Sequence, residues 1–309
     1  MTDVTSRRVR RSRDVAVGIV LGTVADRIFG DPSRFHPVAG MGQLAGKLEN
    51  TVYRDSRGAG LAFTATCVSV AAATGLAIRR GGALGVGVAV WSTLGGTTLC
   101  RIGDLMADAL DRGDIVAARA LIPSLCGRDP AALDEAGICR ATIESVAENT
   151  SDAAVGPLVA AAFAGAPGVI SYRMINTLDA MVGYRTARYD RFGWASARLD
   201  DVANLIPARL SGLLAAILGG APCSAIRAWR ADAHKHPSPN AGVVEAAFAG
   251  ALDFSLGGTT VYPNHVEERP TLGSGPQPTV DDLRSAVALS RRVQYGAAAL
   301  AVGAALLVR

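Results

Sequence analysis

Residues 58–100 read GAGLAFTATCVSVAAATGLAIRRGGALGVGVAVWSTLGGTTLC. Residues 58–78 and 81–100 carry no charge, and each run is long enough to cross a bilayer, which takes about 20 apolar residues. Arg79 and Arg80, followed by two glycines, make a basic turn between the runs. Gly81 and Gly85 are four positions apart, a spacing that allows close helix contact in lipid. The stretch predicts a transmembrane helical hairpin.

The segments around this hairpin predict one helical membrane domain over residues 15–309. Residues 1–14 form a basic N-terminal tail rich in arginine, which is typical of a cytoplasmic membrane anchor. No small-residue cleavage site follows the apolar residues after Val15, so we expect a retained helix rather than a signal peptide. After the hairpin, residues 101–152 are predicted as amphipathic helices with a break at residues 127–130, where Asp129 is the expected N-cap and Pro130 the first helical position. Residues 153–226 are predicted as motif-rich apolar helices, which include an apolar run over 210–226. A soluble segment (227–292) with an irregular loop over 262–282 follows, and then a short C-terminal apolar helix (293–308).

The expected fold class is therefore all-α, a polytopic helical integral membrane protein with amphipathic extramembrane helices and loops. We expect about four to six spans by this criterion. The composition agrees, because 50% of the 309 residues are hydrophobic, only 19% are charged, and the mean hydropathy is +0.27. The net charge of +4 is more than accounted for by the arginines of the tail, so no nucleic-acid surface is expected. Five scattered cysteines without a CxxC pair predict neither a zinc site nor a disulfide framework.

The chemistry gathers in residues 144–209. Glu144, Glu148 and Asp152 are four positions apart and share one helical face. This row is either a solvated face relieved by Arg140, or it holds Mg²⁺ together with Asn149, because Mg²⁺ prefers a few carboxylates plus substrate phosphates. Spacing leaves both readings open.

Further along, acids, amides and arginines recur at helical spacing. Paired guanidinium groups on one face suit phosphate or carboxylate, although they can equally neutralise nearby acids or lipid headgroups. The acids before the next apolar run can also be the start of an interfacial helix. A proline-stiffened loop at residues 236–240 offers donors to a ligand. The residues concerned are Arg173, Asn176, Asp179, Tyr184, Arg185, Arg188, Tyr189, Asp200, Asp201, Asn204, Arg209, His236 and Asn240.

These residues lie in blocks that resemble a known family. The blocks GDPSRFHPV (30–38), GRDPAALDEAGICRATIESVAENTSDAAVGPL (127–158), YRMINTLDAMVGYRTARYDRFGWASARLDDVANLIPARL (172–210), HPSPNAG (236–242) and ERPTLG (268–273) are similar to adenosylcobinamide-phosphate synthase, a membrane protein of cobalamin biosynthesis. The resemblance covers residues 26–292. It implies that a propionate of adenosylcobyric acid is joined to aminopropanol or its O-phosphate, with ATP as cosubstrate and Mg²⁺.

On matching positions, we expect Glu144, Glu148, Asn149 and Asp152 to hold Mg²⁺–ATP. The phosphate and substrate contacts are expected from Arg173, Tyr184, Arg185, Arg188, Tyr189, Arg209, His236 and Asn240. The catalytic set that orients the amine and the corrinoid amides is expected to be Asn176, Asp179, Asp200, Asp201 and Asn204.

The expected location is the inner, cytoplasmic membrane, with a multi-pass topology and the lipid bilayer and other cobalamin-pathway proteins as partners. A positive-inside turn at Arg79–Arg80 would place residues 101–152 outside, away from ATP; we give precedence to ATP access. The rival interpretation is a transporter or membrane-binding module for a corrinoid or anionic solute, which broken helices would suit. A regulatory or scaffolding membrane protein of the same pathway is a second rival.

Overall fold

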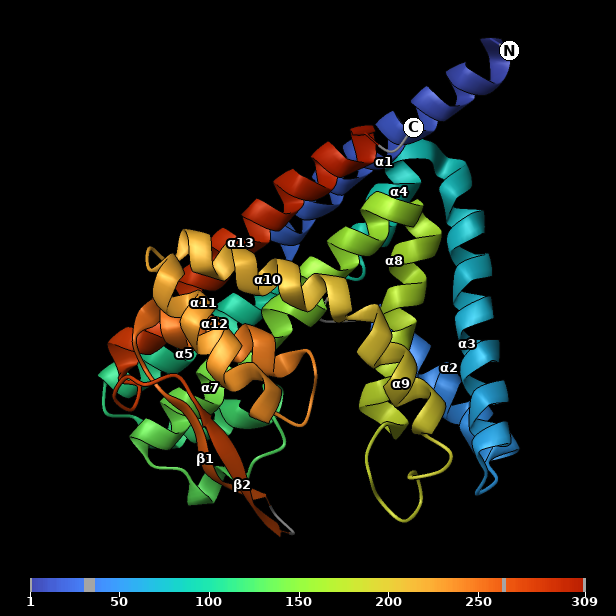
Figure 1. Cartoon of the computed structure of the whole chain (residues 1–309). Helices are drawn as coiled ribbons and strands as arrows, with labels where there is room; N and C mark the ends of the chain where they lie inside the picture. The colour runs from blue at the N-terminus through green and yellow to red at the C-terminus, as the bar shows by residue number, and fades with distance from the viewer. Residues whose placement is uncertain (1, 31–36, 263–264, 308–309) are drawn as a thin grey trace. The chain divides into compact units, whose positions relative to one another are not determined.

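The computed structural model describes residues 2–30, 37–262 and 265–307, and most of them are helical. Figure 1 follows the chain from α1 to α13. The contacts gather into two compact units, each built from separate stretches of sequence. Unit 1 comprises Met1–Gly95, Gly156–Ile206 and Ala297–Arg309, and unit 2 comprises Gly96–Val155 and Pro207–Gly296. The predicted division into a basic tail and one membrane domain stays a prediction.

Unit 1 is built around two closely packed helix pairs. Helix α1 (Thr2–Phe29) lies along α4 (Gly82–Trp91), and α3 (Arg57–Ile78) lies along α8 (Gly156–Val182). Glycine makes the first pairing possible, because a Cβ at Gly18 would stand 2.5 Å from Cβ of Val86. Helices α2 (Pro37–Val52) and α9 (Trp194–Ala203) complete the unit against α3 and α8. In α2 the buried positions are Ala45 and Glu49, whereas Leu44 is 68% exposed.

The predicted hairpin over residues 58–100 is helical as expected in its first run, whereas its second run is not one helix. Helix α3 matches residues 58–78 closely, and its N-terminus is capped by Ser56, whose side chain accepts from the N–H of Ala59. A short 3₁₀ turn (Arg79–Gly81) follows, as the basic turn predicts. Residues 81–100, however, do not form one helix, because α4 ends at Trp91 and α5 (Gly96–Asp111) begins after a break. Moreover, α4 packs chiefly on α1 rather than on α3.

Helix α8 is bent where the sequence weakens it. Gly165 has φ 66° and ψ −148°, and Pro167 lies inside the helix. Only glycine adopts this backbone conformation without strain, so the kink is encoded at Gly165. Residues 151–155 before α8 form a turn of π-helix, a feature often found near functional sites.

Unit 2 surrounds the buried helix α7 (Glu135–Thr150), which is capped by Asp134. Helices α5, α6 (Ile115–Leu121) and α12 (Ala241–Leu252) pack against α7, and α11 (Pro222–Asp232) packs against α12. Asp129 caps a short 3₁₀ turn (Pro130–Ala132) with Pro130 in its first position, which confirms the predicted break. Helix α10 (Leu205–Leu218) ends before Gly219, so the predicted apolar run over 210–226 is two helices rather than one. The other short 3₁₀ turns are Ile122–Ser124 and Ala233–Lys235.

The predicted irregular loop over residues 262–282 is wrong in its first half. Strands β1 (Leu256–Tyr262) and β2 (His265–Leu272) pair antiparallel, with Thr260 opposite Glu267 and a bulge between Leu256 and Gly258. Threonine, valine and tyrosine favour strand conformation, and the proline and glycine content masks that signal in the sequence. Helix α13 (Val280–Leu307) is also longer than the predicted 293–308.

The mostly helical fold is thus confirmed, with one added β-hairpin. By length and composition, two helical stretches among the described residues can cross a membrane, Arg57–Asp111 and Glu135–Val182. A third results if the pair Trp194–Ala203 and Leu205–Leu218, bent by 43°, counts as one span. The described residues therefore contain two or three candidate spans, fewer than the expected four to six.

Candidate functional site

The first group of polar side chains lies in unit 1, where α8 and α9 meet. Asn176 comes from α8, and Asp200 and Asn204 come from α9 and its end. The Asn204 Nδ2 donates to Asp200 Oδ2 at 2.9 Å, and the buried Tyr172 hydroxyl donates to Asn204 Oδ1. Asn176 also makes a side-chain hydrogen bond with Asp200. The fold therefore brings together the predicted set of acids and amides.

The acidic side chains of this group repel one another. Asp179 repels both Asp200 and Asp201, whereas Asp201 also has Arg198 at 3.5 Å. The Asp200 Oδ1 atom is buried and has no hydrogen-bond partner among the described residues. Buried polar atoms are nearly always hydrogen-bonded, so this oxygen is suited to accept from a ligand. Arg173 lies at the edge of the group, with Nη1 3.5 Å from Asn176 Oδ1.

A second group in unit 1 ties the loop over residues 183–193 to α2. Glu49 is 6% exposed, and its Oε1 accepts from Arg188 Nη2 and from the Tyr189 hydroxyl, both at 3.0 Å. The Arg188 guanidinium lies 4.1 Å from the ring centroid of Tyr53, whose hydroxyl donates to the Arg188 carbonyl oxygen at 2.9 Å. Of the predicted phosphate-binding residues, Arg188 and Tyr189 are thus held by an acid within the protein. Tyr184 and Arg185, in the same loop, are exposed.

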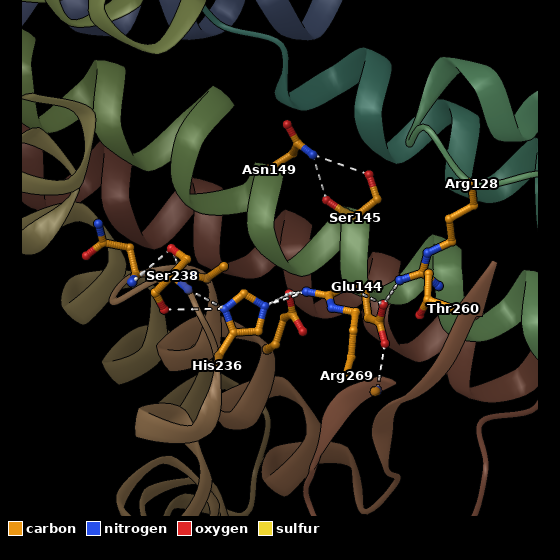
Figure 2. A network of polar contacts seen from close by, with 12 residues as sticks. Arg128, Glu144, Ser145, Asn149, His236, Ser238, Thr260 and Arg269 are labelled. Atoms are coloured by element: carbon orange, nitrogen blue, oxygen red, sulfur yellow. Dashed lines mark hydrogen bonds and ion pairs between the residues drawn. The ribbon is translucent and has the colours of Figure 1, made fainter. Parts of the chain in front are cut away.

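The third group is a buried network in unit 2 centred on Glu144, shown in Figure 2. The Glu144 Oε2 accepts from Arg128 and from Arg269 Nη1, the latter at 3.1 Å, and its Oε1 accepts from the N–H of Gly257 at 2.7 Å. Glu144 and Arg128 are 3% and 5% exposed. Through these bonds Glu144 on α7 contacts the segment before α7 at Arg128, strand β1 at Gly257 and strand β2 at Arg269. Glu144 therefore holds arginines in this structure.

His236 and Glu245 extend the network beyond Arg269. The Arg269 guanidinium donates to His236 Nε2, and His236 Nδ1 lies 3.0 Å from the backbone nitrogen of Ser238 and 3.3 Å from the Ser238 carbonyl oxygen. Burial, and then the nearby Arg269, lower the pKa of His236 to about 4, so the imidazole is neutral. Burial and the neighbouring Glu144 raise the pKa of Glu245 well above its usual range, which favours its protonated form. Glu245 Oε1 lies 3.5 Å from Arg269 Nη2.

The proline-stiffened loop over residues 236–240 is held by Arg209. The Arg209 Nη1 donates to Asn240 Oδ1 at 2.7 Å, and its Nη2 donates to the Pro239 carbonyl oxygen at 3.2 Å. Arg209, His236 and Asn240, which the sequence predicts as substrate-binding residues, are therefore neighbours in unit 2. Their contacts fix the shape of the loop.

The predicted acidic row does not behave as one set. Glu144 is buried among arginines, whereas Glu148 is exposed and Asp152 is half-buried in the π-helical turn. The Asn149 Nδ2 donates to Ser145 at 2.9 Å, as Figure 2 shows, which leaves its oxygen for other contacts. Within the described ranges, no three His, Cys, Asp or Glu side chains are arranged to hold a metal ion. The magnesium role of the row stays a prediction.

Sequence reasoning missed several residues of these groups, namely Glu49, Tyr53, Arg128, Arg269 and Glu245. Arg128 and Arg269 stand in GRDP and ERPTLG, two of the blocks that carry the family resemblance. Their position in these blocks is the sequence signal that could have indicated them as site residues. Glu49 and Tyr53 have no such signal, because they meet residues 188–189 only through the fold.

These features define a mostly helical protein that has helices of membrane-spanning length and buried groups of acids, amides and arginines. A model of the CobD/Cbib protein family matches residues 19–290. The cobalamin biosynthesis protein CobD of Mycobacterium tuberculosis (strain ATCC 25618 / H37Rv) is 55% identical over 296 residues, which cover 93% of this chain and 95% of the relative. The proteins of the same name from Chromobacterium violaceum and Geobacter metallireducens are each 41% identical, over 95% and 92% of this chain and 97% and 93% of their own length. No solved structure matches the chain significantly.

The chain therefore belongs to the CobD/Cbib family. The family prediction made from the sequence blocks is confirmed.

Proposed function

We propose that this protein acts in cobalamin biosynthesis as an adenosylcobinamide-phosphate synthase-like enzyme. It joins a propionate of adenosylcobyric acid to the amine of aminopropanol or its O-phosphate, with ATP as cosubstrate. The family membership supports the pathway, and the acid–amide group of unit 1 supports the chemistry.

The observation that carries the amide-forming step is the buried, unpartnered Oδ1 of Asp200 beside Asp179. An alkylamine has a pKa close to that of lysine, about 10, and therefore reaches the protein as a cation. Two neighbouring carboxylates attract that cation and accept its hydrogen bonds. Asn176 and Asn204, which are hydrogen-bonded to Asp200, orient this carboxylate.

A carboxylate is a poor acyl donor, so the reaction needs activation. The propionate oxygen attacks the γ-phosphorus of ATP, and ADP leaves as the acyl phosphate forms. The ammonium group passes a proton to Asp200, and the free amine nitrogen attacks the acyl carbon. Inorganic phosphate then leaves, and the nitrogen loses its second proton to water. The protein contributes mainly alignment of the two substrates and neutralisation of phosphate charge.

The proposed magnesium ligands are Glu148, Asn149 and Asp152. Mg²⁺ is usually held by one or two carboxylates plus substrate phosphates, and these side chains are the exposed or half-buried members of the predicted row. Glu144 is removed from that set, because both of its oxygens accept hydrogen bonds from the protein. A bound Mg²⁺ would neutralise the phosphates of ATP.

We further propose that the protein is a multi-pass protein of the cytoplasmic membrane, with its ATP site on the cytoplasmic side. Its partners are then the corrinoid, the amine substrate, the lipid bilayer and other cobalamin-pathway proteins. Helices of sufficient length and apolar character support this location.

The experiment is a reconstitution in detergent. Purified protein receives adenosylcobyric acid, aminopropanol phosphate, ATP and Mg²⁺, and product mass is followed with time. An ATP-dependent mass gain that equals amide formation supports the proposal. Corrinoid binding without any product would instead favour a transporter or binding protein.

Single substitutions test separately the proposed roles of Asp200 and Glu148. Asp200→Asn is expected to lower amide formation at least ~100-fold, which is the lower range for general acid–base catalysis, while nucleotide binding is retained. Asp190→Asn, in an exposed part of the neighbouring loop, is the matched control and keeps normal activity. Wild-type activity in Glu148→Ala would contradict the proposed metal ligands.

A further inference from the structure

Three arginines converge on one carboxylate in unit 2. Arg128 and Arg269 both donate to Glu144 Oε2. Arg140, one helical turn before Glu144 on α7, interacts electrostatically with that acid. Its Nη2 donates to the Thr259 carbonyl oxygen at 2.7 Å, and its Nη1 donates to the Gly257 carbonyl oxygen. Figure 2 shows Arg128 and Arg269 on opposite sides of Glu144.

Because Arg128 and Arg269 share the single negative charge of Glu144, this carboxylate alone does not balance their positive charge. Arg128 is 5% exposed, and the acid with which it pairs, Glu144, is shared with Arg269. Taking a cation out of water is costly unless it is paired and its hydrogen bonds are satisfied. The network is thus prepared for a further negative group.

Two of the arginine nitrogens have nothing to donate to. Arg128 Nη1 and Arg140 Nε are buried, and neither has a hydrogen-bond partner among the residues that the structure describes. The two guanidinium groups are close enough to repel each other. Two neighbouring unfilled donors on two cations form the pattern that an oxyanion fills.

The hairpin is shaped to allow this approach. Gly257 and Gly258 have φ of 86° and 84°, a region that favours glycine. A Cβ at Gly258 would lie 2.9 Å from Arg140 Nη1. Glycine at this position therefore lets the strand backbone come close to the arginines without a side chain in their way.

We propose that Arg128 and Arg140, backed by Arg269, form a phosphate-binding site whose ligand oxygens accept from Arg128 Nη1 and Arg140 Nε. The proposal rests on the proposed function, which supplies two phosphate sources, the polyphosphate of ATP and the phosphate of the amine substrate. The network reaches the surface at Arg140, which is partly exposed, and Glu148 acts electrostatically on Arg269. A metal-bound phosphate chain on Glu148 would therefore find these arginines nearby.

The test measures binding without turnover. The dissociation constants of the non-hydrolysable ATP analogue AMP-PNP with Mg²⁺, and separately of aminopropanol phosphate, are measured by calorimetry in detergent. Arg128→Lys keeps the charge beside Glu144 but loses the second donor of the guanidinium fork. We expect this substitution to raise the dissociation constant of one of the two ligands about 10- to 100-fold, which is the effect of losing a charge-assisted hydrogen bond. Arg230→Gln, on the exposed face of α11, is the control and leaves both constants unchanged.

The two dissociation constants either assign the site to one of the ligands or overturn the proposal. Weaker AMP-PNP binding alone assigns the site to the nucleotide, and weaker aminopropanol phosphate binding alone assigns it to the amine substrate. A folded Arg128→Lys protein that binds both ligands normally overturns the proposal. If wild-type protein forms no amide but its phosphate binding still depends on Arg128, the site stands and the proposed function fails.

Should Arg128→Lys not fold, hydrogen exchange on the wild-type protein provides the test. Bound AMP-PNP or aminopropanol phosphate is expected to slow exchange of backbone amides over residues 126–132 and 256–260. Unchanged exchange in both segments, under saturating concentrations of both ligands, overturns the proposal.

Discussion

Glu144 and Glu245 lie in the same buried network, yet they differ in what they contribute. Glu144 balances two arginines, so Glu144→Gln leaves cations buried without a counter-charge, which costs about 3–5 kcal/mol. Burial and Glu144 already favour the neutral form of Glu245, so Glu245→Gln is expected to change stability by less than about 1 kcal/mol at pH 7. Thermal unfolding of both variants in detergent measures the difference. Equal destabilisation would contradict the assignment of charge.

His236 predicts a pH dependence of stability. Its pKa is about 4 in the folded protein, below the ordinary 6.5, so the unfolded chain binds a proton first as the pH falls. The free energy of unfolding should therefore decrease from pH 6.5 to pH 4, by up to about 3 kcal/mol from this group.

The measurement compares wild type with His236→Gln across this pH range. The variant lacks the imidazole and should lose less stability on acidification. The raised pKa of Glu245 makes the free energy of unfolding increase, rather than decrease, as the pH falls toward about 4.5. Because Glu245 is present in both proteins, this contribution largely cancels in the comparison. A difference between the two proteins that does not change with pH would contradict the prediction.

At the scale of elements, Glu49 fastens the loop over residues 183–193 to α2. Glu49→Gln is expected to weaken the bonds to Arg188 and Tyr189 and to let the loop open more often. Limited trypsin digestion detects this, because the loop offers Arg185, Arg188 and Arg191 for cleavage.

Asp55→Asn is the matched control for this loop. Asp55 lies 3.6 Å from Arg191, but both side chains are more than half exposed, so their pairing contributes little. We expect faster cleavage in Glu49→Gln and near wild-type cleavage in Asp55→Asn. The same rate in all three proteins would remove Glu49 as the anchor.

The bend in α8 depends on Gly165. Gly165→Ala should destabilise the protein by about 1–3 kcal/mol, because alanine is strained at this φ and ψ, and its Cβ would also lie 3.3 Å from Val15 Cγ2. Gly303→Ala, in an open position on helix α13, should instead stabilise by roughly 0.5–1 kcal/mol. Thermal unfolding of the two variants measures both shifts, and a neutral Gly165→Ala would show that the bend is not encoded there.

Elements were predictable where the sequence pattern is local. The uncharged run over residues 58–78, the Asp129–Pro130 cap and the proline-rich break at residues 236–240 all appear as expected. The β-hairpin and the break at residues 92–95 were missed, because their signals are short and embedded in apolar or proline-rich sequence. In the candidate site, helical spacing on α8 and α9 gathers the acid–amide set correctly. Spacing along α7 could not show that Glu144 faces arginines from residues 128 and 269, which are distant in sequence.

At the scale of the whole molecule, apolar side chains remain exposed on the helices of unit 1. They include Val17, Val20, Val24 and Ile28 on α1, Leu61 and Val70 on α3, and Leu84 and Val88 on α4. Exposed apolar surface of this kind marks a membrane or protein interface. We expect the protein to stay in the membrane fraction after washing with 1 M salt, which screens charge interactions at a Debye length of about 3 Å, and to be extracted only by detergent.

Removal of residues 2–13, which precede the buried part of α1 at Val15 and Ala16, is not expected to change that result. Immunoblots of the salt-washed pellet and supernatant provide the measurement. Release of the full-length protein by salt would indicate peripheral attachment through its basic start.

The discontinuous make-up of the two units has a consequence for synthesis on the ribosome. The chain passes from one unit to the other after Gly95, Val155, Ile206 and Gly296. At about 5–20 residues per second, roughly 4–17 s separate the emergence of residue 95 from that of residue 182, where α8 ends. During this interval α1, α3 and α4 must wait for α8, so they depend on the insertion machinery or on chaperones for protection. A polypeptide that terminates anywhere before Gly296 contains neither unit complete, and such nascent fragments should be rapidly degraded.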